Sequence, residues 1–135
     1  MKPYRSVKVV LQNSTNERLT VQGLALLRGT WTDKFAPKQG EELPEQSAAT
    51  WSSESLELGA GVSGFLRLGS VRGYTQLNWS LPWVGRFEFR VDSPEGLRAE
   101  VVADERQPDA VVVAVALHEA RRAGEPEHAR QLAPT

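Results

Sequence analysis

Aromatic side chains are the residues of this chain best suited to binding a ligand, and one of them, Trp83, stands on a corner. It follows Pro82, whose ring fixes φ and removes a main-chain donor, and it precedes a Val-Gly turn. Tryptophan and tyrosine suit a boundary between water and an apolar phase. Such rings, gathered on loops, could stack on a sugar, enclose a choline-type headgroup by cation–π contact, or rest in a lipid interface.

The other large aromatic residues divide between core and surface. Trp79 alternates with polar residues in a run that ends at the corner, and together with Phe87 and Phe89 it is predicted to fill a core. Trp51 and Tyr74 fit a core or a surface, as Trp83 does. The pattern alone leaves open which of these rings face a ligand.

The chain has few residues suited to acid–base catalysis or to metal binding. His118 and His128 lie ten residues apart, which is not the close spacing of a zinc site. The chain has no cysteine, and its paired carboxylates fall in predicted loops, where solvating charge is usual. It contains no nucleophile elbow, phosphate-binding loop or dinucleotide fingerprint. We therefore expect a non-enzymatic protein without a metal or other cofactor.

Composition and charge exclude some partners. The 135 residues suffice for one domain, and 16 basic and 17 acidic residues give a formal net charge of −1. No overall field would attract nucleic acid, so we expect no nucleic-acid partner. The N-terminal residues lack the apolar run of a signal peptide, and no stretch has the ~18 apolar residues of a spanning helix. These features predict a soluble protein, cytoplasmic at synthesis, whose export to a membrane surface would need a non-classical route.

Short runs of alternating polar and apolar residues, and one continuous apolar run at 110–117, predict about eight strands. They cover residues 6–12, 19–27, 48–53, 62–68, 74–81, 86–91, 97–101 and 110–117. Residues 28–47 are predicted to be irregular, residues 104–109 a charged loop, and Gly23 a bulge or a point of close approach. We expect a single-domain antiparallel β-sandwich over residues 1–118, with a small barrel as the main alternative. Residues 119–135 are predicted to form a frayed or disordered tail.

Five short motifs resemble those of the aegerolysin and actinoporin-like group. They are Asn13-Ser-Thr, Gly29-Thr-Trp31, Trp51-Ser-Ser-Glu-Ser55, Gly61-Val-Ser-Gly64-Phe65 and Leu77-Asn-Trp79-Ser-Leu-Pro82-Trp83-Val-Gly85. The last is similar to the Trp-Asp-Cys-Pro-Trp-Gly corner of aegerolysins, although Ser80 and Leu81 stand where aegerolysins carry Asp and Cys. Members of this group are β-sandwiches, many of them lipid-binding cytolysins, with related fungal lectins on the same scaffold.

The resemblance implies a module that binds a sphingolipid or phosphocholine-type headgroup at a membrane surface. It implies a binding rim formed by Trp83, Pro82, Trp79 and Tyr74, with Trp51 and Trp31 as neighbours. Actinoporins line their pore with a long N-terminal segment, whereas only a few residues precede the first predicted strand here. Pore formation by this chain alone is therefore not expected. A perforin-type partner, as with aegerolysins, would supply the pore of a cytolytic or toxin system.

Two alternatives belong to other functional classes. In a carbohydrate-binding lectin, the same aromatic rings would stack on sugar, and Asn78, Gln76 or Asp92 would bond its hydroxyl groups. In a structural or assembly protein, the exposed aromatic residues would instead form the subunit interface of a homo-oligomer.

Overall fold

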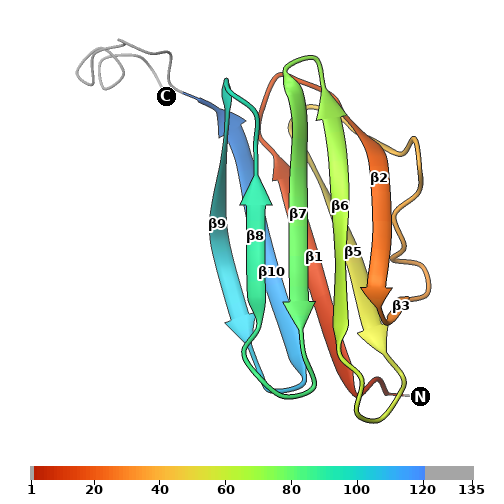
Figure 1. Cartoon of the computed structure of the whole chain (residues 1–135). Coiled ribbons are helices and arrows are strands. Elements are labelled where there is room, and N and C mark those ends of the chain that lie inside the picture. The colour runs from red at the N-terminus through yellow and green to blue at the C-terminus, as the bar shows by residue number, and fades with distance from the viewer. Residues whose placement is uncertain (1, 121–135) are drawn as a thin grey trace.

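The computed structural model describes residues 2–120, and these form ten strands (Figure 1). The strands are β1 (Arg5–Asn13), β2 (Leu19–Arg28), β3 (Thr30–Trp31), β4 (Glu42–Leu43), β5 (Ser47–Ser55), β6 (Val62–Ser70), β7 (Gly73–Leu81), β8 (Glu88–Asp92), β9 (Leu97–Arg106) and β10 (Ala110–Glu119). Residues 2–120 contain no helix, and therefore none long and apolar enough to cross a membrane. The predicted all-β fold is confirmed.

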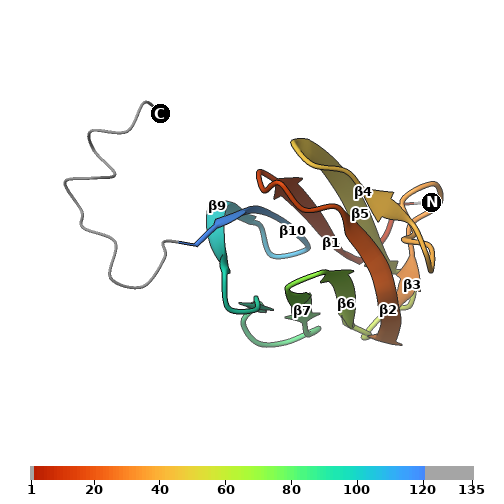
Figure 2. The same ribbon diagram turned by 90° about the horizontal axis from the view of Figure 1, so that it is seen from above.

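The strands form two five-stranded sheets that pack face to face (Figure 2). One sheet has the order β3-β5-β1-β10-β9 and the other β4-β2-β6-β7-β8. The pairs are antiparallel except for β1 with β10, which are parallel. Eight of these strands have five or more residues, and β3 and β4 are two-residue strands within the stretch predicted to be irregular. The predicted sandwich is thus confirmed, and the barrel alternative is excluded because the two sheets remain separate.

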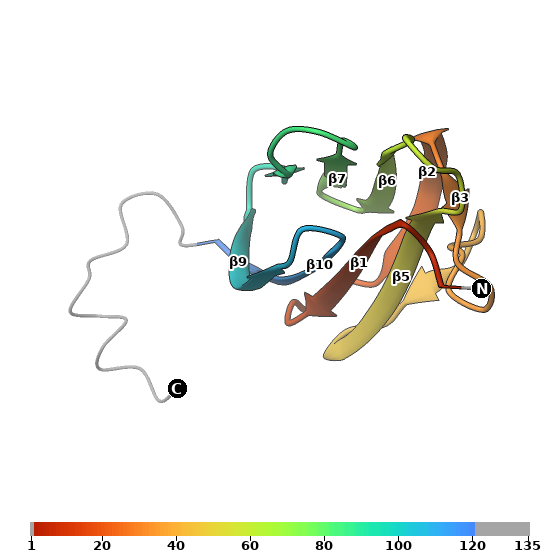
Figure 3. The same ribbon diagram turned by 90° about the horizontal axis from the view of Figure 1, so that it is seen from below.

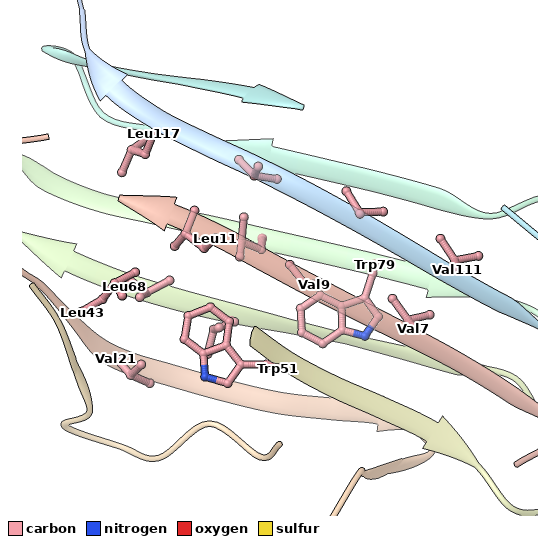
Figure 4. Close-up of a cluster of buried hydrophobic side chains, with 14 of the residues drawn as sticks. Val7, Val9, Leu11, Val21, Leu43, Trp51, Leu68, Trp79, Val111 and Leu117 are labelled. Atoms are coloured by element: carbon pink, nitrogen blue, oxygen red, sulfur yellow. The ribbon is translucent and has the colours of Figure 1, made fainter. Parts of the chain in front are cut away.

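Alternation along the strands builds the core, because successive residues point to opposite faces of a sheet. Leu66 of β6 and Leu77 of β7 are fully buried partners, whereas the neighbouring Asn78 is half-buried on the outer face. The inner faces of both sheets meet in one apolar cluster. Trp51 and Trp79 belong to this cluster and lie between the two layers (Figure 4).

The edge strand β9 differs from the prediction. It continues to Arg106, so residues 104–106 are strand rather than charged loop. An edge strand has one neighbour, and residues 100–106 are exposed, so charged side chains there cost little desolvation. The bulge predicted at Gly23 is confirmed, because the pairing of β2 with β6 shifts register between Val21 and Gly23.

The chain beyond β10 is largely outside the described residues. β10 ends at Glu119, and of the predicted tail, 119–135, only the first two residues are described. The prediction of a frayed or disordered tail, and the position of His128, therefore lie outside the described residues.

Candidate functional site

Three segments meet at one end of the sandwich, which we call the Trp83 end. They are the residues that precede β1 (2–4), the β5–β6 loop (56–61) and the β7–β8 corner (82–87), and they lie at the lower end in Figure 1. Figure 3 looks onto this end. The main-chain N–H of Tyr4 donates to the carbonyl of Ser55 at 2.9 Å, which joins the first segment to the start of the second.

The corner is held in place from two sides. Phe87 is buried, and Arg106 of β9 lies 5.2 Å from the centroid of its ring. On the other side Gly61 approaches the main chain of the corner. A Cβ at Gly61 would lie 2.5 Å from the oxygen of Leu81 and 2.9 Å from Cα of Pro82. Only glycine allows this approach, so the β5–β6 loop and the corner are packed as one unit.

An ion pair supports the corner from β9. Arg106 donates to Asp104 through Nε and Nη2, each at 2.9 Å, and its Nη1 donates to the carbonyl of Phe87 at 3.4 Å. The hydrogen bond from Arg106 lowers the pKa of Asp104, and the same bond raises the pKa of Arg106. Both groups are therefore charged at neutral pH, and the guanidinium lies against the corner.

Trp83 lies half-buried on the outside of this end, between Tyr4, which precedes β1, and Arg5, the first residue of β1. Its ring meets the ring of Tyr4 edge to face, with centroids 6.1 Å apart and an interplanar angle of 67°. The guanidinium of Arg5 lies over the indole at 4.0 Å from its centroid. This cation–π contact covers one face of Trp83. The ring of Tyr4 is exposed beside it.

Arg5 brings a positive charge that the described residues do not neutralise. Its Nη1 donates to the carbonyl of Tyr4 at 2.8 Å and its Nη2 to the carbonyl of Trp83 at 3.0 Å. Its Nε is buried without a hydrogen-bond partner, and no carboxylate within residues 2–120 pairs with the guanidinium. Since carbonyl groups carry no net charge, the site retains the capacity to bind an anion.

Aliphatic side chains project from the two loops of the Trp83 end. Leu58 of the β5–β6 loop is 71% exposed and Val84 of the corner is 84% exposed, and Leu56 is also exposed. Apolar residues gathered at a rim of polar and aromatic groups are typical of a surface that is covered by a partner or a membrane.

The four residues of the predicted rim and their two predicted neighbours are divided among four places. Pro82 and Trp83 lie at the Trp83 end. Trp51 and Trp79 are 3% and 4% exposed, so their rings fill the core and are removed from the rim. The indole N–H of Trp79 donates to Oγ of Ser53 at 3.1 Å, across the two sheets.

Trp31 and Tyr74 lie away from Trp83. Trp31, on the short edge strand β3, is half-buried and packs edge to face on Trp79, with centroids 6.0 Å apart. Tyr74 is exposed at the start of β7, whereas Trp83 follows the end of that strand. Nine residues of extended chain separate them by about 30 Å. The structure therefore does not bring Tyr74 to the same site.

Sequence reasoning missed four residues of this end: Tyr4, Arg5, Leu58 and Val84. The adjacent Tyr4-Arg5 pair precedes the first predicted strand, and Leu58 stands before Gly59 in a turn. An apolar residue in a predicted turn is the signal that could have identified Leu58 and Val84. No comparable signal exists for Arg5, because its contact with Trp83 joins residues far apart in the chain.

The described residues offer no metal site. Among residues 2–120, no three His, Asp or Glu side chains gather closely enough to hold an ion.

Comparison with known proteins gives a likeness in fold. No protein-family model matches the chain, and no curated protein matches its sequence. The crystal structure of the lipid binding protein Nakanori is similar, with a TM-score of 0.67 and 12% sequence identity over 84% of this chain and 70% of that chain. At this identity the likeness shows the fold alone. It supports the fold group that the sequence motifs resemble, and no particular family.

Proposed function

We propose that this chain is a non-enzymatic module that binds membrane lipid, with the Trp83 end turned toward the bilayer. The observation that carries the proposal is the clustering of Trp83 and Tyr4 with the exposed Leu58 and Val84 at one end of the sandwich. Indole and phenol rings suit the headgroup level of a membrane, and the aliphatic side chains would enter the acyl boundary. A structural neighbour that is described as lipid-binding agrees with this assignment.

The apolar contribution would be modest. Full burial of an aliphatic side chain is worth about 1.5–3 kcal/mol, so Leu58 and Val84 together would contribute about 3–6 kcal/mol. Alone this corresponds to weak and reversible membrane association, with a Kd of about 0.05–5 mM. Lipid selectivity must therefore come from the headgroup.

The headgroup that these groups fit is of the phosphocholine type, as in a sphingolipid. Arg5 would bind the phosphate, since its guanidinium lacks a carboxylate within residues 2–120. One face of Trp83 is already covered by Arg5, so the quaternary ammonium would rest on the exposed ring of Tyr4. On this proposal Arg5 and Tyr4 set the headgroup preference, and Trp83 positions both.

Vesicle co-sedimentation tests the proposal. The panel contains phosphatidylcholine vesicles with and without sphingomyelin or ceramide phosphoethanolamine. We expect wild type to bind at least one of these membranes, and Trp83→Ala or the pair Leu58→Ser with Val84→Ser to bind at least tenfold more weakly. Val71→Ser is the matched control, because Val71 is 88% exposed on the β6–β7 turn at the opposite end of the sandwich. Binding that is absent for every lipid, or equal in all variants, would refute the proposal.

A cytolytic role would be shared with a second protein. We propose that this chain supplies membrane recognition and that a perforin-type partner supplies the pore. The expected result is that the chain alone, bound to sphingomyelin vesicles, releases no encapsulated dye. Dye release by the purified chain would show that it forms pores by itself and would remove the need for a partner.

A further inference from the structure

A concave surface lies on the outer face of the sheet that contains β6, β7 and β8. It is a groove of about 340 Å³, at the lower end of the range of small-ligand pockets. Its outward-facing side chains are Leu27, Ser63, Asn78, Ser80, Glu88 and Arg90. None of these belongs to the cluster of Trp83, Tyr4 and Arg5.

The strand register arranges the polar residues as a compact array. Ser80 pairs with Ser63 on one side and with Glu88 on the other. Asn78, two residues earlier in β7, pairs with Arg90. Facing residues have Cβ atoms about 4.5–5.5 Å apart, and residues two apart in a strand lie about 7 Å apart. The array is therefore about 10 Å by 7 Å, a footprint suited to one or two sugar rings.

A chain of hydrogen bonds orients the central amide of this array. Nε of Arg67 donates to Oε1 of Gln76 at 2.9 Å, and Nε2 of Gln76 donates to Oδ1 of Asn78 at 3.1 Å. The amide NH₂ of Asn78 is left to donate into the groove. The side chains of Ser63 and Glu88 have no hydrogen-bond partner among the side chains and main chain of residues 2–120, and Glu88 is exposed. Of the polar groups of the groove, the amide of Asn78 is thus held in one orientation, and the hydroxyl of Ser63 and the carboxylate of Glu88 are left to bond a ligand.

The charge of the groove favours a neutral ligand. Glu88 is negative, and the positive Arg90 is paired with Asp92 at 3.1 Å. An anion would gain little here, whereas a hydroxyl group both donates and accepts, which matches the mixed set of groups. Leu27, at the rim, gives an apolar wall for the C–H face of a ring.

We propose that this groove is a binding site for a neutral carbohydrate of one or two rings, separate from the lipid-binding end. Serine hydroxyls, an amide and a carboxylate bond the sugar hydroxyls, and Leu27 contacts the ring carbons. Because the groove lacks an exposed tryptophan or tyrosine for stacking, the affinity is weak, in the millimolar range.

Titration of the ¹⁵N-labelled chain, followed by amide chemical shifts, tests this site. The probes are glucose, galactose, mannose, N-acetylglucosamine and N-acetylgalactosamine, with inorganic phosphate and free phosphocholine as charged comparisons. At least one sugar is expected to shift resonances of β6, β7 and β8. Asn78→Asp and Glu88→Gln, each close in size to the original residue, are expected to weaken that binding about tenfold.

Gln12→Ala, on the outer face of the other sheet, is the control and should bind the sugar as wild type does. The proposal is overturned if no sugar shifts this face at saturating concentration, or if phosphate or phosphocholine shifts it instead. Vesicle binding by Asn78→Asp is expected to equal that of wild type, so a failure here is distinct from a failure of the lipid-binding proposal.

Discussion

The four tryptophans differ in what their indole rings contact. Trp79 bonds Ser53 across the sandwich, and Trp51 is packed between the sheets. Trp31 closes the edge of the core at β3, and Trp83 alone lies at the Trp83 end. Alternation predicted the burial of Trp79, because its run is long. The predicted strand around Trp51 was too short to show which face it buries, and the observed β5 runs from Ser47 to Ser55.

This division predicts that the two tryptophans of the Leu77–Gly85 motif respond differently to substitution. Trp79→Phe leaves Oγ of the buried Ser53 without its donor and removes core volume, so we expect unfolding free energy to fall by about 1–3 kcal/mol. Trp83→Phe removes no such bond, and we expect a change within about 0.5 kcal/mol. Urea denaturation measures both values. A larger loss for Trp83→Phe would show that the corner is part of the core.

At the scale of elements, the position of the β7–β8 corner is set by contacts with neighbouring elements more than by its own residues. The β5–β6 loop meets it at Gly61, β9 meets it through Arg106, and the start of β1 meets it through Arg5. Periodicity could predict β6 and β7, because the alternation of polar and apolar residues within each strand shows which of its faces is buried. It could not predict that β1 lies parallel to β10, or that Arg5 reaches Trp83, because alternation does not specify which strands become neighbours.

Gly61→Ala tests the coupling between the β5–β6 loop and the corner. The added Cβ would meet main-chain atoms of Leu81 and Pro82, which cannot move without displacing the corner. We expect a loss of about 1–3 kcal/mol in unfolding free energy and weaker sphingomyelin-vesicle binding, although no lipid-facing side chain changes. At Gly23 an added Cβ would make ordinary contacts at 3.7 and 3.8 Å, so Gly23→Ala is the control. Equal behaviour of the two variants would contradict the coupling.

For the whole molecule, the free edges of the sheets decide whether copies of the chain associate. One side of the sandwich ends in the two-residue strands β3 and β4, which offer little template for pairing. The other side ends in β8 and β9. Asp104 and Arg106 pair with the buried Val113 and Val111, so they lie on the inner face of β9. A register shift between Ala114 and Val115 of β10 leaves Val102 of β9 without a partner in the pairing. Inward charges and bulges both oppose edge-to-edge pairing.

We therefore expect the chain to be monomeric in solution, which bears on the alternative of a homo-oligomeric assembly protein. Replacing both Asp104 and Arg106 by valine would leave β9 a longer apolar edge that continues Val101 and Val102, and we expect concentration-dependent association in sedimentation velocity. The pair Asp104→Asn with Arg106→Gln keeps polar side chains on the inner face, so this control is expected to stay monomeric even though it also loses the contact with Phe87. An oligomeric wild type would favour the interpretation as an assembly protein. A monomeric valine variant would show that a feature other than the inward charges of Asp104 and Arg106 keeps β9 from pairing with another copy.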